Sequence, residues 1–195
     1  MISIKKTTAL VLSALLALSG CAKAPDDAMT PVTLNEVAHS IFYAPQYAAI
    51  ELGYFKDQGI DLSLVNGAGA DKVMTALVSG DADIGFMGSE ASIYTYANGA
   101  SDYAVNFAQL TQRAGNFLVG RQPDPAFQWS KLKGTKVLGG RAGGMPQMVF
   151  EYILKQNGID PRTDLNINQG IDFGSTAAAF SEGSGDFTVE FEPSA

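Results

Sequence analysis

The sequence predicts an α/β protein with two lobes, each built on a mostly parallel sheet. Segments in which apolar and polar residues alternate recur between segments with helical spacing, and such a chain forms right-handed crossovers. Glycine-rich turns separate these segments, and the pattern is interrupted over residues 121–129, where Pro123 and Pro125 break any regular element. We therefore expect a first lobe over residues 32–120 and a second lobe over residues 121–195.

The first lobe is expected to alternate strands and helices along its whole length. Its helices are predicted where apolar residues at helical spacing begin after a turn and stop near a glycine or asparagine. The expected helices cover residues 45–52, 71–79 and 89–98. The expected strands cover residues 32–37, 60–65, 84–87, 105–110 and 117–119.

The second lobe repeats this pattern in a shorter form. Its expected strands cover residues 136–138, 165–168 and 187–190, and its expected helices cover residues 146–157 and 175–182. Both lobes contain a helix, a Gly-Asp turn and a strand in succession, with the turn at residues 80–83 in the first lobe and 183–186 in the second. Apart from this unit, the sequence has no internal repeat strong enough to use.

The first 20 residues have the features of a bacterial export signal. Lys5 and Lys6 precede an apolar run that is too short to span a bilayer as a permanent helix. The run ends in Leu18-Ser19-Gly20-Cys21, which fits the lipobox of a lipoprotein signal peptide. We expect cleavage after residue 20 and lipidation of Cys21. The alternative is an ordinary secretory signal that happens to end at a cysteine.

The composition after the signal is that of an acidic exported protein. Residues 21–31 are expected to form a flexible tether between the lipid and the folded part. Removal of residues 1–20 takes away two lysines and no acid, so the formal net charge changes from -7 to -9. This charge argues against nucleic acid as a partner. Because Cys21 is the only cysteine and His39 the only histidine, we expect no disulfide, no metal site and no cofactor.

The candidate site lies at the ends of the predicted strands. Ligands of open parallel sheets bind beyond the carboxyl ends of the strands, where loops lead into helix N-termini. Four loops qualify, at residues 39–43, 85–90, 141–145 and 190–193. The candidate ligand-binding residues are Ser40, Phe42, Tyr43, Met87, Gly88, Ser89, Glu90, Arg141, Gly143, Gly144, Met145, Asp172, Glu190 and Glu192.

Each candidate also has a structural interpretation that needs no ligand. The glycines before the predicted helices let a ligand approach backbone N–H groups, but they also suit a tight turn. Phe42, Tyr43 and Met87 are equally compatible with packing in a core. Glu90 is favourable at a helix N-terminus whether or not a ligand is present. Glu190 and Glu192 alternate with Phe191 and would share one face of a strand, which solvent alone could cover.

A series of short motifs resembles one family. In the first lobe these are Gly53-Tyr54-Phe55, Gly59-Ile60-Asp61-Leu62, Val73-Met74, Ala76-Leu77 and the segment 80–85, and in the second lobe the segments 132–137 and 185–193. In order and spacing they resemble the substrate-binding proteins of ABC importers, in the NMT1/THI5-like branch for nitrate, sulfonate, taurine and thiamine precursors. The resemblance covers nearly all of residues 32–195.

The resemblance implies a type II periplasmic-binding-protein fold, in which two doubly wound lobes joined by a hinge close on a small molecule. Chains of this type continue past the point where this sequence ends, so we expect the second lobe and its return segment to be incomplete. The implied protein is monomeric, is lipid-anchored on the extracytoplasmic face of the cell membrane, and delivers its ligand to an ABC permease and its ATPase.

Two other functions compete with transport. A ligand-sensing lipoprotein would signal to a membrane receptor instead of a permease. An enzyme like the fungal pyrimidine synthases of this superfamily would need a lysine and a histidine in the region of residues 85–92, together with a cysteine-rich motif. This chain has Met87, Ser89, Glu90 and Ala91 there, and no Ser/His/Asp set or phosphate-binding loop. We therefore expect a binding protein and not an enzyme.

The charges of the candidate residues narrow the expected ligand. Arg141 and the glycine loops would suit nitrate or a sulfonate. The acids Glu90, Glu190 and Glu192, together with aromatic side chains, would suit a flat or cationic nitrogen compound such as an aminopyrimidine. A zwitterion such as taurine could use both kinds of group. The sequence favours the nitrogen-bearing ligands.

Overall fold

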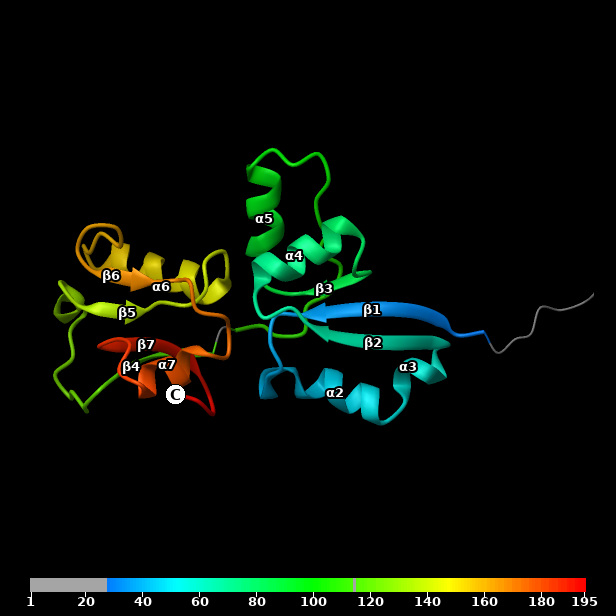
Figure 1. Ribbon diagram of the computed structural model, residues 1–195, viewed down its shortest axis with the longest axis horizontal. Coiled ribbons are helices and arrows are strands. Elements are labelled where there is room, and N and C mark those ends of the chain that lie inside the picture. The colour runs from blue at the N-terminus through cyan, green and yellow to red at the C-terminus, as the bar shows by residue number, and fades with distance from the viewer. Residues whose placement is uncertain (1–27, 114) are drawn as a thin grey trace, which may run out of the picture.

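The computed structural model describes residues 28–113 and 115–195, which form two sheets with helices packed around them (Figure 1). The expected signal peptide, Cys21 and most of the expected tether lie outside the described residues. Thr30 and Pro31, which were expected to end the tether, belong instead to the first strand. We call the first sheet and its helices the first lobe, and the second sheet and its helices the second lobe.

The first lobe is built on a parallel three-stranded sheet in the order β2-β1-β3. Its strands are β1 (Thr30–Glu36), β2 (Ile60–Asn66) and β3 (Ile84–Phe86). Its helices are η2 (Ile41–Tyr43), α2 (Ala44–Glu51), α3 (Tyr54–Asp57), α4 (Ala70–Ser79) and α5 (Glu90–Ala97). In Figure 1, α2 and α3 lie on one side of the sheet and α4 and α5 on the other, as in a doubly wound fold.

The second lobe has a four-stranded sheet in the order β4-β7-β5-β6, in which only the edge strand β4 is antiparallel to its neighbour. Its strands are β4 (Asn116–Gly120), β5 (Lys136–Leu138), β6 (Asn166–Asn168) and β7 (Phe187–Phe191). Its helices are η3 (Trp129–Leu132), α6 (Met145–Gln156) and α7 (Thr176–Ser181). The mostly parallel α/β architecture predicted from the alternation is therefore confirmed.

Two sequence predictions about the segment between the lobes were wrong. Residues 105–110 form no strand: Val105 and Phe107 are 77% and 78% exposed, and the segment pairs with no other strand of the described chain. Alternation alone cannot make a strand where no neighbouring backbone completes the hydrogen bonds. The strand β4, expected at the end of the first lobe, pairs instead with β7 in the second sheet, so the chain crosses between lobes before β4.

Each lobe has its own hydrophobic core. In the first lobe the buried cluster comprises Val37, Ala70, Val73, Met74 and Ala91. In the second lobe it comprises Leu132, Val137, Phe150, Leu154, Ile159, Leu165 and Val189. The clusters share no member, so the two lobes are separate packing units.

The Gly-Asp turns noticed in the sequence occupy equivalent places in the two sheets. In the first lobe the N–H of Thr33 on β1 donates to Asp83 Oδ2 at 2.8 Å, and the N–H of Asp83 donates to the carbonyl of Thr33 at 3.0 Å. In the second lobe Lys136 on β5 and Asp186 make the same two bonds, at 2.8 and 2.7 Å. Asp83 therefore holds the start of β3 against β1, and Asp186 holds the start of β7 against β5.

We expect Asp83→Ala and Asp186→Ala each to lower the free energy of unfolding by about 1 kcal/mol, because each removes a hydrogen bond from a strand N–H. Urea denaturation of the two variants measures the change. Asp61→Ala, on the exposed side of β2, is the control and should leave the unfolding free energy nearly unchanged. Equal stability of Asp83→Ala and the wild type would show that the aspartate does not hold the strand.

Candidate ligand-binding site

The candidate site is a cavity of about 460 Å³ where the two lobes meet. In Figure 1 the strands β1 and β2 point toward the second lobe, and β5 and β6 point toward the first. The carboxyl ends of the two sheets therefore face each other, and the loops that follow these strands line the space between them. A volume of this size falls in the range of small-molecule sites.

Most of the residues predicted as ligand-binding come together around this cavity. Those that line it are Ser40, Phe42, Tyr43, Met87, Gly88, Ser89, Glu90, Arg141, Gly144 and Met145. The predicted residues outside the lining are Gly143, Asp172, Glu190 and Glu192. The loops 39–43, 85–90 and 141–145, which lie far apart in the sequence, thus form one surface.

The four predicted residues outside the lining have other partners or positions. The Gly143 N–H donates to Gln147 Oε1 at 2.7 Å within a tight turn, and Asp172 forms ion pairs with Arg141 and Lys72. Glu190 is buried in the sheet, where its carboxylate accepts from the Thr188 hydroxyl at 2.7 Å. Glu192 lies beyond the end of β7 and is exposed. The two acids were expected to share one ligand-facing surface, and the structure does not place them on the cavity.

Aromatic rings from both lobes form the walls of the cavity. Phe42 of the first lobe meets Phe191 of the second edge to face, with ring centroids 5.4 Å apart. The ring centroids of Phe173 and Phe191 lie 5.5 Å apart, and those of Tyr43 and Phe86 lie 4.4 Å apart. These rings offer apolar faces on which a flat or aliphatic ligand body can pack.

A buried carboxylate beneath the cavity holds the loop that carries Phe42 and Tyr43. Glu36, at the end of β1, accepts hydrogen bonds from Gln46 Nε2 at 3.1 Å and from the Tyr47 hydroxyl at 2.8 Å. It also contacts His39 Nδ1 at 3.1 Å. His39, for which no metal role was expected, is therefore part of this polar network. The network joins β1 to α2 and sets the position of the loop between them.

Two ionisable side chains of the first lobe face the cavity. Burial raises the pKa of the Tyr43 hydroxyl to about 12, and the nearby carboxylates of Glu36 and Glu90 add to this effect. Tyr43 therefore remains protonated at neutral pH and can donate a hydrogen bond. Glu90 is only 2% exposed, and burial also raises its pKa.

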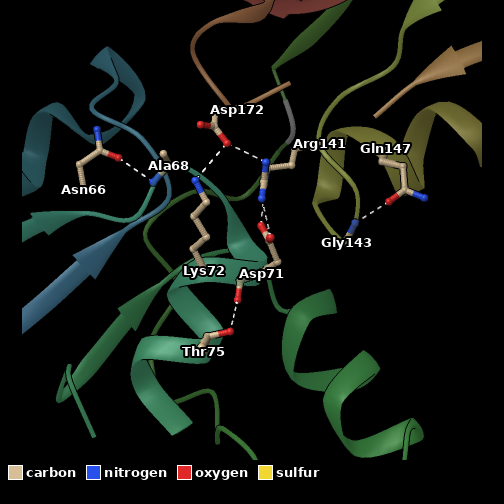
Figure 2. A network of polar contacts seen from close by, with 9 residues as sticks. All are labelled: Asn66, Ala68, Asp71, Lys72, Thr75, Arg141, Gly143, Gln147 and Asp172. Carbon is tan, nitrogen blue, oxygen red and sulfur yellow. Dashed lines mark hydrogen bonds and ion pairs between the residues drawn. The ribbon is translucent and has the colours of Figure 1, made fainter. Parts of the chain in front are cut away.

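An ion-pair network joins the two lobes beside the cavity, and its central residue, Arg141, belongs to the lining (Figure 2). Arg141 of the second lobe donates from Nε and Nη2 to the carboxylate of Asp71 at the start of α4, both at 2.7 Å. Its Nη1 donates to Asp172 at 2.7 Å, and Lys72 of the first lobe also donates to Asp172, at 3.1 Å. The hydrogen bonds from Arg141 hold the pKa of Asp71 below its usual range.

Several lining residues, including Gly69, Ala70 and Phe173, lie outside the four predicted loops, and the longest such stretch runs from Asn106 to Arg113. Asn106 and residues 108–113 border the cavity, and the Asn106 side chain donates to the Ser92 hydroxyl at 2.8 Å. The alternating pattern had suggested a strand here. The other loops were selected because they follow the carboxyl ends of predicted strands. The same criterion would have selected this stretch, because its carboxyl end carries the polar residues Gln109, Thr111, Gln112 and Arg113.

The lining suits recognition by stacking, hydrogen bonds and charge. It combines aromatic rings, backbone groups beside Gly88 and Gly144, and the side chains of Tyr43 and Glu90. Over residues 28–113 and 115–195, no group of three or more His, Cys, Asp or Glu side chains is arranged to hold a metal ion. Nor is any helix in those residues both long and apolar enough to cross a membrane.

Two lobes that enclose a cavity at the facing ends of their sheets define the architecture of a two-lobed ligand-binding protein. The family model described as "NMT1/THI5 like" matches residues 41–193, so the chain belongs to this family. The chain is also 48% identical over 181 residues to the "Putative binding protein YtlA" of Bacillus subtilis (strain 168). This match covers 93% of the chain and 54% of the relative, so the chain spans about half the length of the relative.

Solved structures share the fold. A protein from Bordetella bronchiseptica RB50 matches 84% of this chain with a TM-score of 0.68 and 25% identity, over 52% of its own length. The ligand-binding component of an ABC-type import system from Staphylococcus aureus matches 85% of the chain with a TM-score of 0.61 and 18% identity, over 56% of its length. The periplasmic aliphatic sulphonate binding protein SsuA from Escherichia coli matches 84% with a TM-score of 0.51 and 19% identity, over 55% of its length. The fold is therefore that of the periplasmic binding proteins.

The ion pairs of Figure 2 predict that Arg141→Gln will shift the lobes toward a more open arrangement. The variant removes the contact with Asp71, and a partly exposed ion pair contributes up to about 1 kcal/mol, which corresponds to about a fivefold change in the ratio of open to closed molecules. Small-angle scattering should therefore give a larger radius of gyration. Lys155→Gln, on an exposed part of α6, is the matched control. An unchanged radius for Arg141→Gln would contradict a role for the network in closure.

Proposed function

We propose that this chain captures a small nitrogen- or sulfur-containing molecule between its lobes and delivers it to the permease of an ABC importer. The observation that carries the proposal is the cavity itself, which is lined by loops from both lobes. A ligand in that position contacts both lobes and stabilises the closed arrangement over the open one. Membership of the NMT1/THI5-like family and the shared fold with importer binding proteins support the same function.

In this proposal the protein is a passive carrier. Its cycle consists of capture, closure, docking and release, and the energy for transport comes from the partner ATPase. The ligand classes consistent with the lining are sulfonates, taurine, nitrate and thiamine-pyrimidine precursors.

We expect a ligand of this class to raise the melting temperature of the 195-residue chain. A ligand at about 100 times its Kd stabilises the folded state by about 2.7 kcal/mol, which corresponds to a shift of several degrees. The thermal-shift panel contains taurine, alkanesulfonates, nitrate, bicarbonate, aminopyrimidines and related amines. Substitution of Phe42 by Ala should reduce the shift, because it removes an aromatic wall. No shift with any member of the panel would contradict the proposed substrate class.

The proposal places the protein on the extracytoplasmic face of the cell membrane as a lipid-anchored monomer. A tether from Cys21 would keep the lobes within reach of the permease. Expression of the chain in a bacterial host tests this placement. Intact-mass analysis should find a mature form that begins at lipidated Cys21.

A Cys21→Ser variant should keep residues 1–20 and carry no lipid, because the thiol is the acceptor. Ser13→Ala leaves the apolar run and the cysteine intact and should be processed like the wild type. A wild-type protein with an unmodified Cys21 thiol would exclude the lipid anchor.

A further inference from the structure

The Glu90 side chain is buried at the cavity. It is the first residue of α5, is 2% exposed and belongs to the cavity lining. Within the part of the chain that the structure describes, neither carboxylate oxygen takes part in a hydrogen bond. The backbone N–H groups of Glu90 and Met145 lie close enough to favour the ionised form, but neither reaches it with hydrogen-bond geometry.

A second buried carboxylate in the same lobe shows what a structural role requires. Glu36 is 1% exposed, and its two oxygens contact the side chains of His39, Gln46 and Tyr47. An ionised carboxylate that is removed from water without such partners costs free energy, so buried acids in proteins are normally paired. Glu90 lacks these partners and opens onto a cavity, which indicates that the missing donor comes from the ligand.

One of the two arginines that line the cavity already has its charge compensated within the protein. Arg141 lines the cavity, but its guanidinium donates to both Asp71 and Asp172, whose carboxylates compensate its charge. Arg113 also borders the cavity, but it is exposed, where solvent and salt screen its charge. Among the described residues, the ionisable group of the site that is both buried and unpaired is therefore an acid.

We infer that Glu90 is the specificity-determining residue of the cavity and that it binds a cationic nitrogen group, an ammonium or an amidinium, on the transported molecule. Such a group supplies both the charge and the N–H donors that the carboxylate lacks, and the aromatic walls hold the rest of the ligand. This inference rests on the proposed function and selects, among the ligand classes left open there, those that carry a cationic nitrogen.

Gly88 offers a second way to test the carboxylate without changing its charge. A Cβ placed on Gly88 would overlap the Glu90 carboxylate, so Gly88→Ala should push the side chain out of its present position. The backbone of Gly88 is not in the left-handed region, which means that alanine itself fits the main chain.

The test is isothermal titration of the 195-residue chain with two pairs of probes that differ in their nitrogen group. Taurine is compared with isethionate, in which a hydroxyl replaces the ammonium, and benzamidine is compared with benzoate, in which a carboxylate replaces the amidinium. The wild type should bind taurine and benzamidine more tightly than their partners. Glu90→Gln should weaken the nitrogen-bearing probes by about 10- to 100-fold, because it removes a charge-assisted hydrogen bond.

Two further variants complete the design. Gly88→Ala should weaken the same probes, whereas Glu51→Gln, which removes an exposed acid on α2, should change nothing. Without ligand, Glu90→Gln should melt at or above the wild-type temperature, because it replaces an unpaired buried carboxyl group with an amide that cannot ionise. A lower melting temperature would indicate a structural role for Glu90 and would overturn the inference.

Other outcomes separate the inference from the proposed function. Equal or tighter binding of isethionate or benzoate, or unchanged binding of the nitrogen-bearing probes to Glu90→Gln, overturns the inference and leaves a binding protein of another specificity. Failure of both taurine and benzamidine to bind the wild type also overturns it. The proposed function is contradicted only if, in addition, no compound of the thermal-shift panel raises the melting temperature.

Discussion

Parallel pairing around β1 and β5 is the constraint on which the rest of the structure depends. Because β2 and β3 run parallel to β1, and β6 and β7 run parallel to β5, the carboxyl ends of each set meet at one edge of their sheet. The two edges face each other, so loops that are distant in sequence become neighbours in one cavity. Without that topology, Ser40, Gly88 and Gly144 would have no reason to lie together.

The ionisable side chains near the cavity are of two kinds, those that have partners within the protein and those that are available to a ligand. Glu36 has three polar partners and holds the first cavity loop, while the Arg141 network spans the boundary between the lobes. These charges are compensated inside the protein. Glu90 is not, and the difference between Glu36 and Glu90 is one of hydrogen-bond partners, since both are almost fully buried. A protein that leaves a buried carboxyl group unpaired at a cavity loses stability there, as binding sites commonly do.

Most of the fold could be predicted because the sequence patterns are local. Seven of the eight predicted strands are present, and glycine stops identified the ends of α2, α4 and α6. Local patterns could not show that residues 105–110 form no strand or that β4 belongs to the second sheet. Both facts depend on which other strand lies next to the segment in the folded chain. The equivalence of the two lobes was visible only in the Gly-Asp turns, because Asp83 and Asp186 make backbone bonds that allow few other residues. The packing around these turns can be formed by many different side chains, so it leaves no comparable sequence pattern.

The site was predictable to the extent that strand ends determine it. The loops at 39–43, 85–90 and 141–145 line the cavity for this reason. The prediction for Glu190 and Glu192 rested on side-chain alternation, which cannot tell whether a strand faces a cavity, a core or solvent. Glu190 turns to Thr188 inside the sheet, and Glu192 lies beyond the strand end. The unpaired state of Glu90 is a tertiary property that no sequence pattern encodes.

The central claim is that one ligand engages both lobes at once. Hydrogen exchange with the tightest-binding compound of the panel tests it most directly, because exchange reports local opening of backbone amides. The account predicts that the ligand slows exchange at residues 85–92 of the first lobe and at residues 141–147 of the second in the same experiment. Protection confined to one of these segments, or found in neither, would contradict it.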